Sequence, residues 1–151
     1  MKKIYSLALI ILLLLPACSQ ANGAQNPAQT EAIVKAYIAA YENKDPAAYQ
    51  VVFDKDAIYL DVGSPSSRST GAMYVRNLST IIATEFKTGV FDVKLTSYFV
   101  SDDGRYATLL GAYTNKGFDE NVHTVPIAIL LEFQNGKIIK EIDYYDGTRF
   151  G

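Results

Sequence analysis

The order of the patterns along the chain limits the fold more than any other feature of the sequence. Between residues 30 and 86, apolar side chains recur at helical spacing, whereas from residue 90 onward they alternate as in strands. Helices followed by a run of antiparallel strands are typical of α+β domains with the helices on one face of the sheet. Because long strands twist, we expect a strongly curved, mainly antiparallel sheet that wraps three N-terminal helices into a cone-shaped (α+β) barrel.

The first half of the domain predicts three helices and one short strand. Thr30 is the expected N-cap of the first helix. Asp45 and Pro46 provide an N-cap and a first helical residue for the second helix. A short strand is expected at residues 57–62, and a third helix at residues 70–86.

The second half predicts an antiparallel meander. Strands are expected at residues 90–100, 106–114 and 122–133. Asn135-Gly136 then forms a hairpin turn into the last strand, which ends in phenols and carboxylates. Such a sheet end is where a small-molecule site is expected, in the mouth of the cone.

The N-terminal segment predicts a secretory signal peptide. Lys2 and Lys3 precede an apolar run at residues 4–15, which is shorter than the roughly 20 residues of a transmembrane helix. The Leu-Pro-Ala-Cys that follows resembles a bacterial lipobox, in which the single cysteine of this chain, Cys18, would be lipidated. The alternative is an unlipidated signal peptide. The expected units are a signal peptide at 1–17, a lipidated Cys18 with a flexible tether at 18–29, and one domain at 30–151.

Charge and cysteine content narrow the function classes. Removal of the signal peptide leaves twelve basic and sixteen acidic residues, a net charge of −4, which does not suit a nucleic-acid-binding surface. We therefore expect no nucleic-acid partner, and attachment to the membrane through the lipid on Cys18. The expected location is the bacterial cell envelope, facing the periplasm or the exterior.

Asp61 and Tyr37 are the first candidates for a chemical role. Asp61 ends the short strand among apolar neighbours, and an inward-facing carboxylate there would have a raised pKa suited to a general base. The alternative is an exposed aspartate that begins a turn. Tyr37 shares a helix face with Tyr41, and a phenol there either donates to an oxyanion or packs in the core.

His123 and the last strand supply further candidates. His123 is the only histidine and could act as an acid or base in a pocket, but a lone histidine does not make a zinc site. On the last strand, only one alternating set can face the interior, and the sequence leaves open which one. The two sets are Glu141, Asp143 and Tyr145, and Ile142, Tyr144 and Asp146. The chain contains no phosphate-binding glycine loop and no Gly-x-Ser-x-Gly elbow, so we expect no cofactor or metal and no acyl-enzyme mechanism.

The domain resembles the SnoaL-like group of the nuclear-transport-factor-2-like superfamily, with ketosteroid isomerase as a relative. The resemblance is carried by residues 37–41, Asp45, residues 53–57, residues 61–64 through Gly71, residues 135–138 and residues 143–146. It implies that Tyr37 corresponds to an oxyanion-hole tyrosine and Asp61 to the base of ketosteroid isomerase. The position of that enzyme's second oxyanion donor holds Ile129 here. SnoaL-type cyclases use an Asp/His pair as acid and base, and the resemblance implies that Asp143 and His123 could form a similar pair here.

Three functions follow as hypotheses. The favoured one is an envelope-anchored protein that binds an apolar or aromatic small molecule in a hydrophobic cone pocket. The alternatives are a polyketide-cyclase-like or ketosteroid-isomerase-like enzyme without a cofactor, and a homodimeric interaction module that pairs through its convex sheet face. The predicted catalytic residues are Asp61, Tyr37 and Asp143, and the predicted ligand-binding residues are Tyr41, Tyr59, His123 and Tyr145.

Overall fold

A curved six-stranded sheet forms the frame of the domain. The computed structural model describes residues 25–63, 73–74, 83–87, 89–117 and 119–150. The strands are β1 (Phe53–Asp61), β2 (Met73–Tyr74), β3 (Asp92–Val100), β4 (Tyr106–Lys116), β5 (Val122–Gln134) and β6 (Lys137–Tyr145). Their order across the sheet is β2-β1-β6-β5-β4-β3, and every neighbouring pair is antiparallel except the parallel pair β1–β6.

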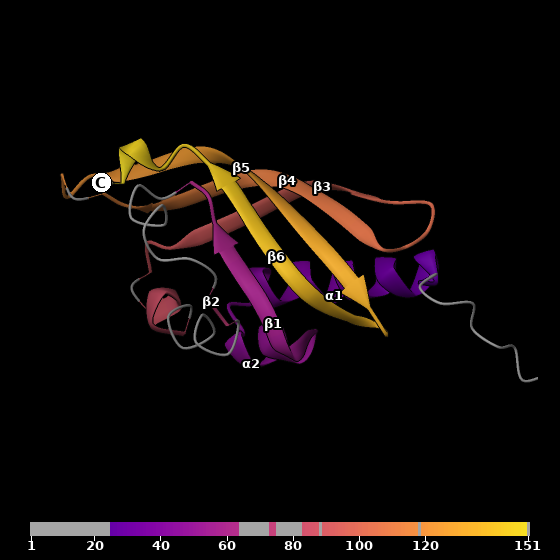
Figure 1. Cartoon of the computed structure of the whole chain (residues 1–151). Helices are drawn as coiled ribbons and strands as arrows, with labels where there is room; N and C mark the ends of the chain where they lie inside the picture. Colours follow the sequence, from indigo (N-terminus) through magenta and orange to yellow (C-terminus); the bar gives the residue numbers. More distant parts are fainter. Residues whose placement is uncertain (1–24, 64–72, 75–82, 88, 118, 151) are drawn as a thin grey trace, which may run out of the picture.

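Two helices, α1 (Pro27–Glu42) and α2 (Pro46–Val51), lie under one face of this sheet (Figure 1). The predicted α+β class and the mainly antiparallel sheet are therefore confirmed. The described strands leave the sheet open, with β2 and β3 at its two edges, so they do not close into the expected barrel. A short 3₁₀ helix, η1 (Gly147–Arg149), follows β6.

The first helix begins earlier than its predicted cap. Asn26 is the N-cap, its side chain accepts a hydrogen bond from the Ala28 backbone at 3.0 Å, and Pro27 occupies the first helical position. The prediction of Thr30 as N-cap is wrong. Thr30 lies inside α1, fully buried, and its hydroxyl donates to the Gly104 carbonyl at 2.7 Å. The start of α1 thus falls within the segment that we predicted as tether.

The second helix matches its sequence signal, whereas the third differs from it. The Asp45 side chain caps α2 by accepting from the backbones of Ala47 and Ala48, both at 3.0 Å. In the segment predicted as a third helix, residues 83–87 are helical, but Met73–Tyr74 forms β2. The helix prediction is wrong there because these two residues pair with the edge of β1, a long-range contact that local periodicity does not reveal. The rest of the predicted helix lies outside the described residues.

The predicted hairpin between the last two strands is confirmed. Asn135 and Gly136 have φ values of 51° and 71°, the left-handed conformation that Asn-Gly turns favour. The turn joins β5 to β6, which pair along most of their length. This hairpin brings the polar end of β6 into the middle of the sheet.

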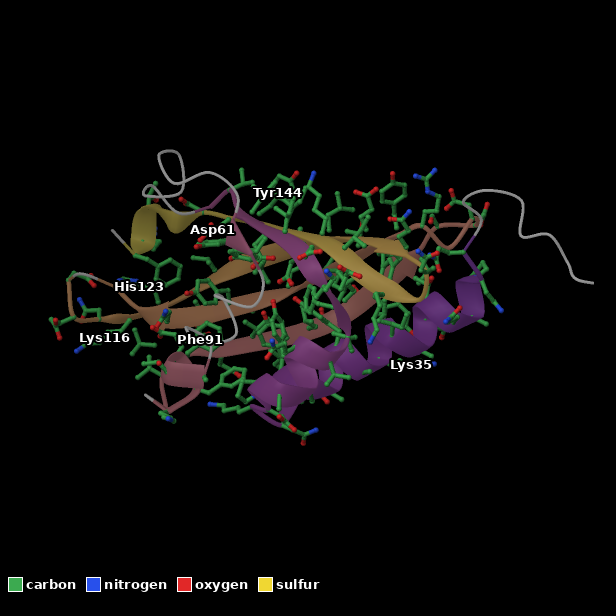
Figure 2. The ribbon with its side chains drawn as sticks, turned by 60° about the horizontal axis from the view of Figure 1, so that its bottom comes forward. Lys35, Asp61, Phe91, Lys116, His123 and Tyr144 are labelled. Atoms are coloured by element: carbon green, nitrogen blue, oxygen red, sulfur yellow. The ribbon has the colours of Figure 1, made fainter. Side chains whose placement is uncertain are left out.

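A bulge in β6 decides which side chains of that strand face the helices. Phe133 pairs with Ile138 and Glu132 pairs with Lys140, so one extra residue, Ile139, interrupts the alternation. Ile138 and Glu141 are therefore both fully buried although they are three residues apart. Beyond the bulge, Glu141 and Asp143 are buried and Tyr145, on the same side of the strand, is half-buried. Tyr144 is 45% exposed and lies on the face away from α1 (Figure 2).

The core lies between the sheet and the helices. Its fully buried members include Val34 and Tyr37 on α1, Tyr49 on α2, and Leu109, Ile129 and Leu131 on the sheet. Within the described ranges, no helix is long and apolar enough to cross a membrane.

Candidate functional site

Three carboxyl groups lie in one row between β1, β6 and the two helices. The parallel pairing of β1 with β6 places Tyr59 beside Glu141 and Asp61 beside Asp143. Paired residues of parallel strands point to the same face, so all four side chains face the interior. We call Glu141, Asp143 and Asp61 the carboxylate row; it runs from the deepest position to the end of the strands.

The deep end of the carboxylate row is held by two phenols from the helices. The Tyr37 hydroxyl donates to Glu141 Oε1 and the Tyr49 hydroxyl donates to Glu141 Oε2, each at 2.7 Å. All three side chains are fully buried. Tyr37 was predicted as an oxyanion donor, and in this structure its hydroxyl donates to Glu141. Glu141 and Tyr49 were not among the predicted site residues.

Asp143 occupies the middle of the row. Its Oδ2 accepts a hydrogen bond from the Tyr59 hydroxyl at 3.1 Å. Its Oδ1 is buried and has no hydrogen-bond partner among the residues that the structure describes. The side chain as a whole is nearly inaccessible, because the residue is only 7% exposed.

Asp61 forms the more accessible end. Its Oδ2 accepts a hydrogen bond from the Tyr145 hydroxyl at 2.9 Å, and both residues are half-buried. Gly63 makes this arrangement possible, because a Cβ there would lie 2.5 Å from both the Tyr145 ring and the Tyr145 carbonyl oxygen. The absence of a side chain at Gly63 thus lets Tyr145 lie against the end of β1.

Burial dominates the electrostatics of the row. Removal from water raises the pKa of Glu141, although the hydrogen bonds from Tyr37 and Tyr49 act in the opposite direction. Burial, followed by the nearby charge of Glu141, raises the pKa of Asp143 well above its ordinary value. Burial also raises the pKa of Tyr37, Tyr49 and Tyr59, so these phenols remain protonated donors.

Aromatic rings surround the row at both ends. The centroid of the Tyr41 ring lies 5.2 Å from that of Tyr37 and 5.3 Å from that of Tyr49. The predicted ligand residue Tyr41 therefore packs against the two phenols that hold Glu141. Near Asp61, the Tyr145 ring lies 5.0 Å from Tyr113, which itself lies 5.0 Å from Phe150. The half-exposed end of the row therefore offers aromatic faces and phenol hydroxyls beside a carboxylate.

His123 lies at the start of β5, close to Lys116 of the neighbouring strand β4 (Figure 2). Its Nε2 lies 2.9 Å from Asp119 Oδ1, and its ring packs 6.2 Å from Phe150. The structure thus places the His123 ring beside Phe150, and among the described residues its hydrogen bonds are with Asp119 and not with Asp143.

A surface depression of about 500 Å³ lies elsewhere, beside α2 and the start of β1. It is lined by Ala47, Gln50, Val51, Phe53, Asp54, Lys55 and Lys137, none of which belongs to the carboxylate row. Among the described residues, no group of three or more His, Cys, Asp or Glu side chains could hold a metal ion.

Comparison with known proteins supports the fold. No protein-family model and no curated protein matches the sequence. Bal32a, from a soil-derived mobile gene cassette, is 22% identical with a TM-score of 0.67, covering 79% of this chain and 90% of Bal32a. A hypothetical protein with a ketosteroid isomerase-like fold from Catenulispora acidiphila, solved with trimethylamine, is 23% identical with a TM-score of 0.60, covering 78% and 88% of the two chains.

A third neighbour is a putative polyketide cyclase from Xanthomonas campestris pv. campestris. It is 14% identical with a TM-score of 0.63, and the match covers 80% of this chain and 93% of that one. The chain therefore has the ketosteroid isomerase-like fold, also called nuclear-transport-factor-2-like, as the sequence resemblance predicted.

The structure brings six of the seven predicted catalytic and ligand-binding residues to one interior region. Tyr37, Tyr41, Tyr59, Asp61, Asp143 and Tyr145 face it, whereas His123 lies at its outer end. Their chemical roles stay predictions. Cys18 lies outside the described residues.

Proposed function

We propose that this domain binds a small apolar or aromatic molecule between the curved sheet and its helices. The observation that carries the proposal is the half-exposed end of the row, where the Tyr145 hydroxyl donates to Asp61 at 2.9 Å beside the Tyr113 and Phe150 rings. Ligand sites commonly combine apolar walls with a few convergent polar groups. In the same fold, the Catenulispora acidiphila protein was solved with trimethylamine, which supports a small-molecule site.

Two adjacent tyrosines provide a matched test. Tyr145 faces the interior, whereas Tyr144 faces outward from the same strand and is 45% exposed. With 2-naphthol as a neutral aromatic probe, Tyr145→Ala should weaken binding about tenfold or more, since one lost aromatic contact of about 1.4 kcal/mol changes affinity tenfold. Tyr144→Ala should leave binding unchanged. Equal effects of the two substitutions, or no binding of 2-naphthol by the wild-type protein in calorimetry, would contradict the proposal.

An enzyme of the cyclase or isomerase type is the second candidate. The carboxylate row carries carboxyl groups in different environments, a buried Asp143 and a half-exposed Asp61, which is a typical arrangement for acid and base. In this alternative, Asp61 removes a proton from the carbon next to a carbonyl group. Tyr37 would exchange its hydrogen bond with Glu141 for one with the enolate oxygen. A neighbour in the fold is described as a putative polyketide cyclase.

Proton exchange distinguishes the enzyme from a binding protein. The α-protons of 2-tetralone in D₂O should exchange faster with the wild-type protein than in buffer, as followed by NMR. Asp61→Asn should abolish this acceleration, because the amide cannot accept the proton. Asp56→Asn, at an exposed position of the same strand, is the control. Exchange that is as fast with Asp61→Asn as with the wild type would exclude Asp61 as the base.

We further propose that the domain is anchored in a bacterial cell envelope through a lipid on Cys18. The basis is the sequence Leu-Pro-Ala-Cys after an apolar run. Expressed in a bacterium, the full chain should fractionate with membranes and incorporate labelled palmitate, whereas Cys18→Ser should do neither. A soluble, unlabelled wild-type protein would contradict the lipid anchor.

The outward face of the sheet supports a homodimer as a further proposal. Tyr144, Ala128 and Leu110 lie in one row across β6, β5 and β4, and Tyr144 and Leu110 are 45% and 38% exposed. An apolar sheet face of this kind suits pairing with a second copy. Sedimentation should show a dimer that Tyr144→Arg dissociates and Tyr145→Ala does not; a monomer at every concentration would contradict the proposal.

A further inference from the structure

One buried oxygen in the carboxylate row has no hydrogen-bond partner in the part of the chain that the structure describes. Asp143 Oδ1 has no hydrogen bond among the described residues, whereas Asp143 Oδ2 and both oxygens of Glu141 accept from phenols. A buried polar atom without a partner is rare and costly, and it calls for an explanation. The atom needs either a donor or a proton of its own.

In the described part of the chain, no hydrogen bond and no ion pair reaches this oxygen. From α1 and α2, Tyr37 and Tyr49 donate to Glu141, and the Tyr41 ring packs beside them. From β1, Tyr59 donates to the other oxygen of Asp143, and from β6, Tyr145 donates to Asp61. The neighbour on β5 is the apolar Ile129. The ion pairs found among the described residues are those of Glu31, Asp56, Glu120 and Asp119, all outside the row.

We propose that Glu141 and Asp143 share one proton at neutral pH, carried on Asp143 Oδ1 and donated to Glu141. The two residues lie two positions apart beyond the bulge, on the same face of β6, and both are buried. Two carboxylates so placed cannot easily both be ionised. Glu141 is the better anion because each of its oxygens receives a phenol hydrogen bond, so the proton belongs to Asp143.

The raised pKa values agree with this geometry. Burial raises the pKa of both groups, and Asp143 is additionally raised by the charge of Glu141. A protonated Asp143 satisfies its own Oδ1 as a donor, and its Oδ2 keeps the hydrogen bond from Tyr59.

The shared proton divides the row into an acid and an anion. Asp143 is a neutral carboxylic acid, and its register partner Asp61 is the half-exposed carboxyl group at the open end. Glu141 is a positioning residue, since it acts by holding the proton on Asp143. The pair exists with or without a ligand, so the inference stands apart from the proposed binding function.

Infrared spectroscopy of the full wild-type chain tests the proton directly. At pH 7 we expect the carbonyl stretch of a protonated carboxylic acid, shifted when aspartate is labelled with ¹³C at its carboxyl carbon and unshifted when glutamate is so labelled. This measurement needs no variant. A spectrum without that band would show both groups ionised and overturn the proposal, and a shift on glutamate labelling would place the proton on Glu141 and overturn it as well.

A variant adds a second readout. Asp143→Asn mimics the protonated acid, because the new amide group can donate toward Glu141 while its oxygen accepts from Tyr59. In the wild type, a group whose folded pKa is raised makes stability fall as pH rises above its ordinary value of 3.8. One extra bound proton changes the unfolding equilibrium constant about tenfold per pH unit. Asp143→Asn should reduce this slope, whereas Asp56→Asn, at an exposed site, should not; identical slopes for the wild type and Asp143→Asn would contradict the proposal.

Discussion

Two phenol–carboxylate contacts in this domain have the same chemistry and opposite electrostatics. The Tyr37 hydroxyl donates to Glu141 at 2.7 Å inside the core, and the Tyr98 hydroxyl donates to Glu31 at 2.9 Å on the surface. Glu31 also pairs with Lys35 at 2.8 Å, and its side chain is 45% exposed. The pKa of Glu31 is lowered, chiefly by the hydrogen bond from Lys35, whereas burial raises the pKa of Glu141. The surroundings of each carboxyl group, and not its hydrogen bond from a phenol, decide whether its pKa is raised or lowered.

The comparison also fixes the direction of each pH effect. A lowered pKa, as in Glu31, makes stability fall as the pH decreases through the folded value. A raised pKa, as in Glu141, makes stability fall as the pH increases through the folded value. The two contacts therefore affect opposite limbs of the stability profile.

The largest loss of stability is expected from Glu141→Ala, and Glu31→Ala is its counterpart at the surface. Glu141→Ala should lower the free energy of unfolding by about 2–6 kcal/mol, because two buried phenol donors lose their acceptor at about 1–3 kcal/mol each. Glu31→Ala should leave urea denaturation unchanged within error, since water replaces the lost partner. Equal losses of stability in Glu141→Ala and Glu31→Ala would show that burial does not decide how much each contact contributes.

Removing a phenol hydroxyl should cost less stability than removing the carboxyl group, and a Tyr→Phe substitution deletes only one heavy atom. Tyr37→Phe should lower the free energy of unfolding by about 1.5–3 kcal/mol, the usual range for a hydrogen bond to a charged group. Tyr98→Phe is the matched control, because it deletes the same hydroxyl from a contact at the surface that is only partly buried. A Tyr98→Phe loss as large as that of Tyr37→Phe in chemical denaturation would show that burial is not the deciding factor.

The loss of stability from removing the half-buried contact between Tyr145 and Asp61 should lie between the losses of Tyr37→Phe and Tyr98→Phe. Tyr145→Phe should cost about 0.5–1.5 kcal/mol in thermal or urea unfolding, because water can reach the carboxylate once the hydroxyl is gone. A loss greater than that of Tyr37→Phe would show that accessibility does not rank the three contacts.

The smallest effect is expected on the acid side, from Asp119. Hydrogen bonds from Asn121 and then His123 lower the pKa of Asp119 from 3.8 to about 2. Its contribution is therefore present above its ordinary value and is lost as the pH falls toward the folded one. Asp119→Asn should flatten the decline of the thermal midpoint in acid, and Asp56→Asn should not. An unchanged acid limb in Asp119→Asn would contradict this reading.

Much of the framework was predictable because its signals are local. The cap at Asp45, the left-handed turn at Asn135 and Gly136, and the alternation of the later strands each depend on neighbouring residues. The helix start was missed at Asn26, although Asn followed by Pro is itself a local signal. The resemblance to ketosteroid isomerase predicted the fold, and the comparison with known structures confirms it.

The site was only partly predictable because its members meet across long distances in the chain. Asp61 and Asp143 were selected as candidates, but nothing in the sequence indicated that parallel pairing places them side by side. Glu141 was left among the alternatives for the last strand. Its inward direction depends on the bulge at Ile139, which shifts the alternation by one residue.

By itself, the sequence determined the α+β order, the turn before the last strand and the supply of phenols and carboxyl groups, because each is written in spacing or residue type. Only the tertiary structure decided which carboxyl groups are buried and which phenol meets each of them. Those contacts depend on the register of β1 against β6 and on the bulge in β6. Since burial sets the direction of a carboxyl pKa, the chemistry of Glu141 and Asp143 follows from packing that no local pattern encodes.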